Sequence, residues 1–256
     1  MKMNELTSFF TDKGMKLTDG EGFCFGDTNR EITKIAVCFT ATLQAIECAV
    51  AEGCNLMVIH ERMFFPTSYS GGLLEKHLSE KINYPRVCAL IKHGITVFIA
   101  NKSIEMPYQR KAFLEAAGIS FDGKLVAVEE QLYTIPEVSL GELADRLMES
   151  LSIDEVLVTG HADRKVSTVA VLNGGEGITR QPQGMTKYTR QHPDVLICGE
   201  TDEYPKWAAQ ELGIGMIALG HTNFDGIGLQ MLASDLDEWN HGAVFIDEPR
   251  PWRVFA

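Results

Sequence analysis

Short apolar runs alternate with segments of helical length along most of the chain. In the first half, apolar runs at residues 35–39, 56–59 and 95–100 are separated by stretches with a helical pattern, the first of them over residues 43–52. Strands that are buried on both faces read as continuous apolar runs, and intervening helices are typical of βαβ units around a mostly parallel sheet. The pattern therefore predicts an α/β fold for the first half.

The second half repeats this alternation of strands and helices. The predicted strands lie at residues 166–172, 194–198, 215–219 and 243–247, with helices around residues 207–212 and 224–236. A glycine-rich turn with Gly174, Gly175 and Gly177 follows the first of these strands, and a polar helix is expected after the turn. The repeated order predicts a second α/β lobe built like the first.

The two predicted lobes have mixed, largely parallel sheets. We place the first lobe at residues 1–125 and the second at residues 126–256, and we expect the C-terminal segment to pack back on the first lobe. Residues 129–136 and a helix over residues 140–151 fall in the linking or second-lobe region.

Charge and hydropathy narrow the range of partners. With 23 Lys+Arg against 35 Asp+Glu the formal net charge is −12, which argues against nucleic acid or an anionic membrane as the main partner, because phosphate binding needs a cationic surface. No stretch of the sequence approaches the roughly 18 to 20 apolar residues of a membrane-spanning helix. The amino-terminal residues also lack the apolar core of a signal peptide. We therefore expect a cytoplasmic protein.

Six cysteines are scattered along the chain without a C-x-x-C pair: Cys24, Cys38, Cys48, Cys54, Cys88 and Cys198. Several sit inside apolar runs, which predicts buried, reduced thiols rather than disulfides or a zinc knuckle. Cys198 ends a predicted strand and is also a candidate nucleophile. An enzyme that depended on this thiol would be inactivated by alkylation and would be indifferent to chelators.

Candidate metal ligands follow several of the predicted strands. In open α/β sheets, ligands bind beyond the carboxyl ends of the strands. His60 and Glu61 occupy such a position, as do His221 and Asp225. Imidazoles and carboxylates together are the donors that Zn²⁺, Mn²⁺ and Fe²⁺ prefer. His221 and Asp225 share one face if a helix begins at His221, whereas adjacent ligands such as His60 and Glu61 suit two ions better than one.

Each of these features also has a simpler interpretation. A histidine that begins a loop is often a capping or surface residue, and H-x-x-x-D occurs frequently by chance. Glu61 and Arg62 can form an ordinary surface ion pair. The glycine turn could cradle an anion, but Glu176 would repel phosphate and a plain turn is favoured.

Taken in order, the segments resemble one family, the GTP cyclohydrolase 1 type 2 proteins, also called NGG-interacting-factor-three-like proteins. KIAVCFTATLQAIECAVAEGCNLMVIHERMFF, from Lys34, is similar to the family's first strand, helix and second strand with its double-histidine loop. The other similar segments are GFCFGD, ITVFIANKSIEM, KVSTVAVLNGGEG, DVLICGE and GMIALGHTNFDGIGLQMLASDL. Their shared order and spacing are far more specific than any single motif.

The resemblance implies a two-lobed α/β fold with a dinuclear metal site in the cleft between the lobes, and ring-shaped hexamers built from dimers. The family's paired histidines fall on His60 and Glu61, its loop aspartate on Glu105, and its C-terminal histidine and glutamate on His221 and Asp225. The implied cofactors are divalent Fe, Mn or Zn ions, one or two per chain.

Five positions depart from the family pattern. Glu61 replaces the second histidine, Asn101 the loop histidine, Glu105 the loop aspartate, Asp225 the last glutamate, and Thr40 an aspartate in the first strand. A carboxylate in place of an imidazole makes the site harder, which favours Mn²⁺, Fe²⁺ or Mg²⁺. A mononuclear site, or none, is equally compatible with these residues.

Two functions from different classes follow. The first is a cyclohydrolase-like, metal-dependent hydrolase of a nucleotide-like or heterocyclic substrate, in which metal-bound water supplies hydroxide and Glu200 is a candidate base or proton shuttle. The second is a non-catalytic metal-binding or protein-interaction scaffold of the same family. Glu200 favours the hydrolase, whereas the loss of ionisable groups at Thr40 and Asn101 favours the scaffold.

Overall fold

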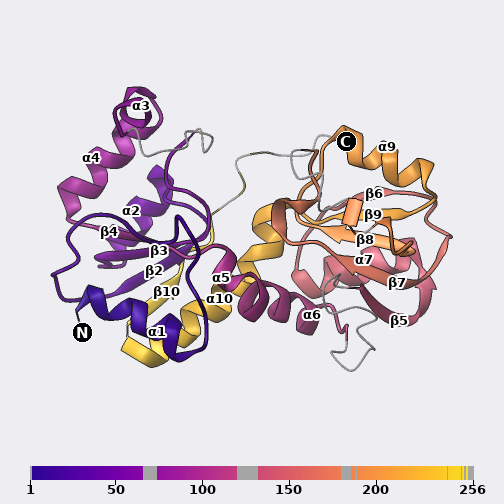
Figure 1. Cartoon of the computed structure of the whole chain (residues 1–256), viewed down its shortest axis with the longest axis horizontal. Helices are drawn as coiled ribbons and strands as arrows, with labels where there is room; N and C mark the ends of the chain where they lie inside the picture. The colour runs from indigo at the N-terminus through magenta and orange to yellow at the C-terminus, as the bar shows by residue number, and fades with distance from the viewer. Residues whose placement is uncertain are drawn as a thin grey trace. The chain divides into compact units, whose positions relative to one another are not determined.

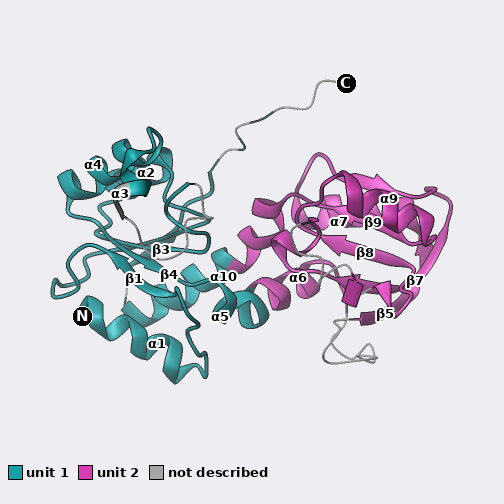
Figure 2. Cartoon of the chain, turned by 45° about the horizontal axis from the view of Figure 1, so that its top comes forward, with its two compact units in different colours: residues 1–108, 229–256 teal, residues 109–228 magenta. Residues whose placement is uncertain are grey.

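The computed structural model describes residues 2–65, 74–119, 132–179, 186–187, 189–240, 242–248, 250 and 252. The chain divides into two compact units (Figure 2): unit 1 comprises residues 1–108 and 229–256, and unit 2 comprises residues 109–228. Each unit contains a five-stranded mixed sheet with helices packed on it (Figure 1). The predicted α/β class, with two lobes of similar build, is confirmed.

The sheet of unit 1 has the strand order β1-β4-β3-β2-β10. Its strands are β1 (Gly22–Phe25), β2 (Ile35–Cys38), β3 (Leu56–Ile59), β4 (Thr96–Ile99) and β10 (Ala243–Phe245). Only β1 runs antiparallel to its neighbour, and the other pairs of this sheet are parallel. The three central strands are completely buried, as their apolar runs predicted.

Helices cover both faces of this sheet because side chains alternate along each strand. The helical elements of unit 1 are η1 (Met3–Glu5), α1 (Leu6–Asp12), α2 (Leu43–Ala51), α3 (Leu74–Ser79), α4 (Asn83–His93), α5 (Lys102–Ile104) and the C-terminal part of α10 (His221–Asn240). On one face, α1 and α10 pack against the sheet, with the Phe10 and Phe98 rings stacked 5.2 Å apart. On the other face, α2 and α4 contribute Ile46 and Leu90.

The sheet of unit 2 has the order β5-β7-β8-β9-β6. Its strands are β5 (Leu132–Ser139), β6 (Leu157–Thr159), β7 (Lys165–Val171), β8 (Val195–Cys198) and β9 (Gly215–Ala218). The outer strands β5 and β6 are antiparallel to their neighbours, and the inner pairs are parallel. The helical elements are α6 (Lys111–Ala116), α7 (Leu140–Leu151), η3 (Gly174–Glu176), α9 (Glu203–Glu211) and the start of α10, preceded by the π-helix η2 (Glu105–Arg110).

The predicted boundary near residue 125 lies outside the described residues. Phe113 and Leu114 of α6 pack into the core of unit 2, so the chain first enters this unit at Gln109. Helix α10 belongs to both units, because Phe224 packs in the core of unit 2 and Leu232 in that of unit 1. Residues 229–256 are therefore part of unit 1.

Three strands differ from the sequence-based prediction. β1, β5 and β6 were not predicted as strands, and β5 covers much of the segment interpreted as a linking or second-lobe region, which belongs to unit 2. All three run antiparallel at sheet edges and carry exposed or half-buried positions, so they lack the continuous apolar run that marks a buried strand. Most of the polar helix expected after the glycine turn lies outside the described residues.

The expectation of buried thiols is half wrong. All six cysteines are free, but only Cys38, Cys54 and Cys198 are buried, while the other three are exposed. Two of the exposed residues, Cys48 and Cys88, lie on the outer faces of α2 and α4.

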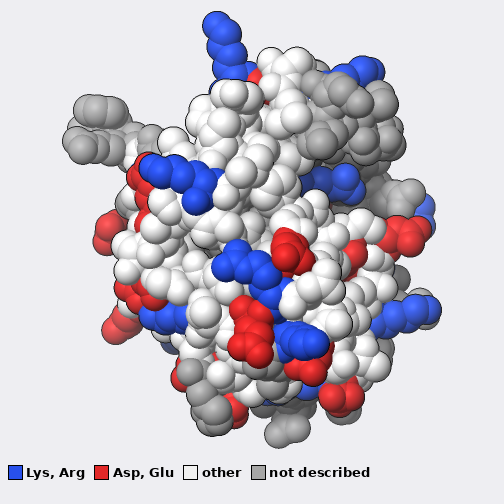
Figure 3. All heavy atoms as spheres, turned by 90° about the vertical axis from the view of Figure 1, so that its left-hand side faces the viewer, with Lys and Arg blue, Asp and Glu red and all other residues white. Residues whose placement is uncertain are grey.

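No helix in the described part of the chain combines the length and the apolar character needed to cross a bilayer. The 20-residue α10 is long enough, but it carries four acidic residues, Asp225, Asp235, Asp237 and Glu238. On the face drawn in Figure 3, the coloured basic and acidic side chains lie interspersed with one another.

Candidate metal centre

His60 follows β3, and its ring is held by the loop after β4. The side chain is 3% exposed, and Nδ1 lies 3.2 Å from the carbonyl oxygen of Ala100. Asn101 Nδ2 donates to the His60 carbonyl at 3.1 Å and lies 3.4 Å from Nε2. A hydrogen bond from Nδ1 to a backbone carbonyl fixes the tautomer that places the lone pair on Nε2, which is how proteins orient many metal-binding histidines.

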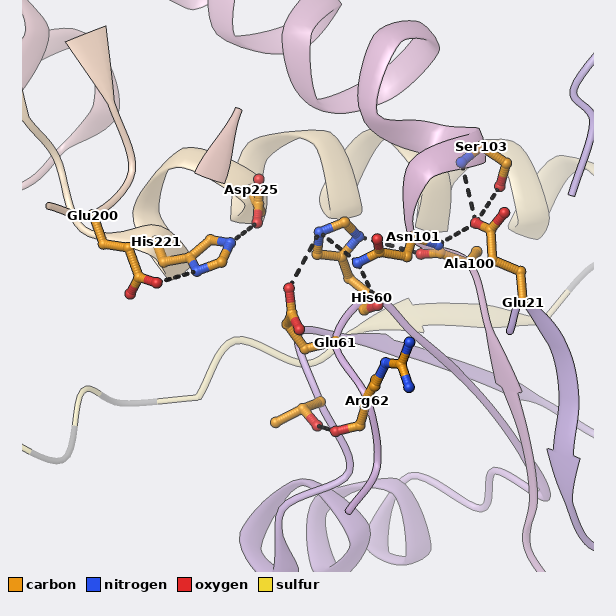
Figure 4. Close-up of polar contacts among 11 residues, drawn as sticks. Glu21, His60, Glu61, Arg62, Ala100, Asn101, Ser103, Glu200, His221 and Asp225 are labelled. Carbon is orange, nitrogen blue, oxygen red and sulfur yellow. Dashed lines mark hydrogen bonds and ion pairs between the residues drawn. The ribbon is translucent and has the colours of Figure 1, made fainter. Parts of the chain in front are cut away.

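Glu21 supports this loop, a role that no pattern in the sequence indicated. Its Oε1 accepts hydrogen bonds from the backbone of Asn101 at 2.5 Å and from the amide and hydroxyl of Ser103 at 3.1 and 2.8 Å. Partial burial raises the pKa of Glu21, but hydrogen bonds from Thr18 and Ser103 outweigh this and hold the pKa below its ordinary value. The carboxylate therefore fixes Asn101, which in turn contacts His60 (Figure 4).

His221 begins α10 directly after Gly220, whose φ of 91° suits only glycine. His221 Nε2 lies 3.0 Å from Asp225 Oδ2, and its Nδ1 lies 3.5 Å from Glu200 Oε1. The prediction that His221 and Asp225 share one helix face is thus confirmed. Glu200 comes from the end of β8, so neighbouring strands bring these groups together (Figure 4).

The two carboxylates dominate the electrostatics of this imidazole. Burial by itself lowers the pKa of His221, but hydrogen bonds and charges from Asp225 and Glu200 raise it to about 10. The same hydrogen bond to His221 lowers the pKa of Glu200 against the opposing effect of burial. A proton and a metal ion compete for such a nitrogen, since only neutral imidazole binds metal.

The glycine turn after β7 is shaped to fit against this pair. A Cβ atom on Gly174 would lie 2.1 Å from His221 Nε2 and 3.0 Å from Asp225 Oδ2. The Gly174 carbonyl accepts a 2.9 Å hydrogen bond from the amide of Glu200. The turn therefore has a packing role that the sequence did not reveal, and its interpretation as a plain turn stays a prediction.

Among the residues that the structure describes, His60, His221 and Asp225 form a group that could hold a metal ion. Each offers one ligand atom, and these atoms lie within 4.8 Å of one another. His60 and Asp225 are buried, and the His221 side chain is 17% exposed. Two imidazoles and one carboxylate fit Fe²⁺, Mn²⁺ or Zn²⁺, so the residues present suit a divalent ion.

The other predicted ligands lie outside that group. Glu61 Oε1 is 3.9 Å from His60 Nε2, and the Glu61 side chain is partly exposed. Glu105 is half-buried at the start of η2. Their roles as ligands stay predictions. Thr40, one of the positions that depart from the family pattern, donates from Oγ1 to the Arg62 carbonyl at 3.0 Å and so stabilises the turn after β3.

Cys198 is a poor candidate for a nucleophile. It is completely buried, and burial raises the pKa of its thiol to about 12. The thiolate is the reactive form of cysteine, so this site does not favour thiol catalysis.

Comparisons with known proteins agree on one family and one fold. The sequence model described as Duf34/NIF3 (NGG1p interacting factor 3) matches residues 2–251. A Clostridium acetobutylicum protein named GTP cyclohydrolase 1 type 2 homolog is 26% identical over 235 residues, covering 86% of this chain and 82% of its own. A Chlamydia trachomatis protein with the same name is 25% identical over 263 residues, covering 98% and 96% of the two chains.

A solved structure extends the likeness to three dimensions. The crystal structure of a Bacillus cereus protein related to NIF3 matches with a TM-score of 0.79, covering 100% of this chain and 99% of that one. At 14% sequence identity, this similarity shows the fold alone.

Proposed function

The chain belongs to the Duf34/NIF3 family, and on this premise we propose that it is a metal-dependent hydrolase of a small nucleotide-like or heterocyclic substrate. The observation that carries the proposal is the group formed by His60, His221 and Asp225. The name GTP cyclohydrolase 1 type 2 homolog, borne by curated relatives, supports a heterocyclic substrate.

In this proposal, His60, His221 and Asp225 hold a divalent Fe, Mn or Zn ion. When bound, such an ion lowers the pKa of a water ligand enough to supply hydroxide near neutral pH. The carbonyl of Ala100 orients the His60 ring, and the turn at Gly174 keeps the His221 ring in place. These contacts prepare the ligand set before any ion arrives.

Glu200 is the proposed proton acceptor. Its side chain is 46% exposed, and the lowered pKa keeps it as a carboxylate at neutral pH. It can therefore accept a proton from a reacting water while its hydrogen bond with His221 holds it in position. A proton acceptor must be reachable by the substrate and must be ionised, and the exposure and lowered pKa of Glu200 meet these two requirements.

The proposal extends to a second ion and to assembly. Glu61 lies beside His60, and together with Glu105 it would complete a dinuclear site with two ions per chain, whereas the group of His60, His221 and Asp225 alone would hold one. We also propose a homo-oligomer, a hexameric ring of dimers, with a small-molecule substrate as the partner. The net charge of −12 supports a substrate other than nucleic acid.

Glu200→Gln tests the catalytic part of this proposal. The metal-loaded protein is incubated with a panel of nucleotides and purine or pteridine heterocycles, and product is followed by chromatography. We expect turnover that a chelator abolishes, and a loss of about 10²-fold or more in Glu200→Gln with metal content unchanged. His93→Ala, on an exposed side chain of α4, is the control. Metal-loaded protein that turns over nothing in the panel would favour the scaffold function.

A further inference from the structure

We propose that unit 2 carries a second ligand site, a groove beside β6 and α9 that binds a planar aromatic molecule with an anionic group. The groove has a volume of about 660 Å³, within the range of small-molecule sites. Its walls come from β6 and the loop after it, from α9, and from the turn before β9. They comprise Val158, Thr159, Gly160, His161, Arg164, Glu203, Lys206, Trp207, Gln210, Gly213 and Ile214.

The groove lies at the opposite end of β9 from His221. Gly213 and Ile214 precede β9, whereas His221 follows its other end. β6 runs antiparallel to β9 and pairs Thr159 with Met216, so the end of β6 points toward the start of β9. The groove is thus separate from the His221–Asp225 pair, and the proposal does not rest on the metal centre.

Trp207 provides the aromatic wall. Its side chain, on α9, is 60% exposed, which leaves a large apolar ring in contact with water. Exposed aromatic rings are stacking platforms for planar ligands, because every base or heterocycle has a π-face. Tyr204 on the same helix is 76% exposed but does not line the groove, so it offers a matched comparison.

Two basic residues, Arg164 and Lys206, line the groove together with Trp207. Arg164 Nη1 donates to the Gly213 carbonyl, which fixes the guanidinium at the groove while its remaining N–H groups can serve a ligand. Lys206 Nζ lies 2.8 Å from Glu203 Oε1, and the Lys206 side chain is only 26% exposed. Two cations against one carboxylate, in a chain with a net charge of −12, make this groove locally suited to an anion.

A ring and an anionic group are therefore the two features that the groove can recognise together. The ring would stack on Trp207, and a phosphate or carboxylate would lie near Arg164 and Lys206. A nucleoside monophosphate has both features, whereas a nucleoside or a sugar phosphate has only one.

Isothermal titration calorimetry of the full-length, metal-free protein tests the site, with AMP as the probe. We expect one AMP per chain, with weaker binding of adenosine and of ribose 5-phosphate. Trp207→Ala should weaken AMP binding about tenfold or more, since stacking on one aromatic ring is worth about that factor. Lys206→Met should weaken AMP but leave adenosine unchanged, and Tyr204→Ala should change neither.

Three results would overturn the proposal. The first is an absence of AMP binding, or equal AMP affinity in Trp207→Ala, Lys206→Met and the wild type. The second is loss of AMP binding in His221→Ala with retention in Trp207→Ala, which would place the nucleotide at the metal centre. The third is a change of assembly mass by light scattering in Trp207→Ala alone, which would mean that a second copy of the chain covers the groove. Circular dichroism confirms that each variant is folded.

Discussion

The imidazole of His221 lies between two carboxylates and against a glycine that leaves no room for a side chain. Asp225 is 1% exposed, and a buried carboxylate needs a positive partner. Asp225 and Glu200 raise the pKa of His221, which makes its imidazolium one such partner, and a divalent ion would be another.

Gly174→Ala should weaken metal binding without unfolding the protein. The new Cβ would lie 2.1 Å from His221 Nε2, so the ring must move, and changes to groups that orient a ligand typically cost about 10- to 100-fold in metal affinity. Gly175→Ala is the neighbouring control, because its Cβ would lie 3.4 Å from Glu200 Oε1 and 3.5 Å from His221 Cε1, which are ordinary contacts that leave the ring in place. Competition with a chromophoric chelator measures both, and equal affinities would contradict the packing role.

Asp194 ties β7 to β8, and its contribution depends on pH. Its Oδ2 accepts four hydrogen bonds, from the amide and hydroxyl groups of Ser167 and Thr168. Burial raises the pKa of Asp194, but these hydrogen bonds lower it below its ordinary value. Because the folded pKa lies below the unfolded one, the stabilisation is complete above the unfolded value of about 3.9 and is lost as the pH falls through the folded pKa.

Asp194→Asn should therefore lower the free energy of unfolding by about 1 to 2 kcal/mol at neutral pH, toward the low end because the carboxylate is partly exposed. The deficit should shrink below about pH 4. Urea unfolding at both pH values measures the difference, with the exposed Asp163→Asn as the control. A deficit that stayed constant with pH would show that the charge of Asp194 is not responsible.

At the scale of elements, burial decided which strands the sequence could reveal. β2, β3, β4, β8 and β9 are buried along their whole length, and each was found as an apolar run. β5 and β6 mix exposed and buried positions, so neither a continuous run nor a clean alternation marks them. The segment of β5 also carries Pro136 within a shift of register, and it was interpreted as a linking or second-lobe region.

Helix α7 shows the opposite case, because its start is encoded locally. Ser139 Oγ accepts a 3.1 Å hydrogen bond from the amide of Glu142, and loss of such a cap costs about 1 kcal/mol. Ser139→Ala should lower the free energy of unfolding by that amount. Ser150→Ala, in the last turn of the same helix, should leave it unchanged or slightly higher, because alanine favours helix. Urea unfolding of both variants measures these changes. An equal loss of unfolding free energy in Ser139→Ala and Ser150→Ala would argue against the cap.

For the whole molecule, the order of segments revealed more than any residue. The family and the two-lobed α/β fold were predicted from that order, and His60, His221 and Asp225 were found at strand ends. Contacts between distant segments were not predictable: Glu21 reaches Asn101 across 80 positions, and Gly174 meets His221 only through the fold. These contacts position the candidate ligands, but they leave no local pattern in the sequence.

Elemental analysis of the purified, extensively dialysed protein, with His221→Ala measured beside it, tests the central claim most directly. The account predicts one or two ions of Fe, Mn or Zn per chain in the wild type. It also predicts a clear loss in His221→Ala with unchanged circular dichroism, because the imidazole is one of the three proposed ligands and the core clusters do not include it. A wild-type protein without metal even after reconstitution, or a variant with unchanged metal content, would contradict it.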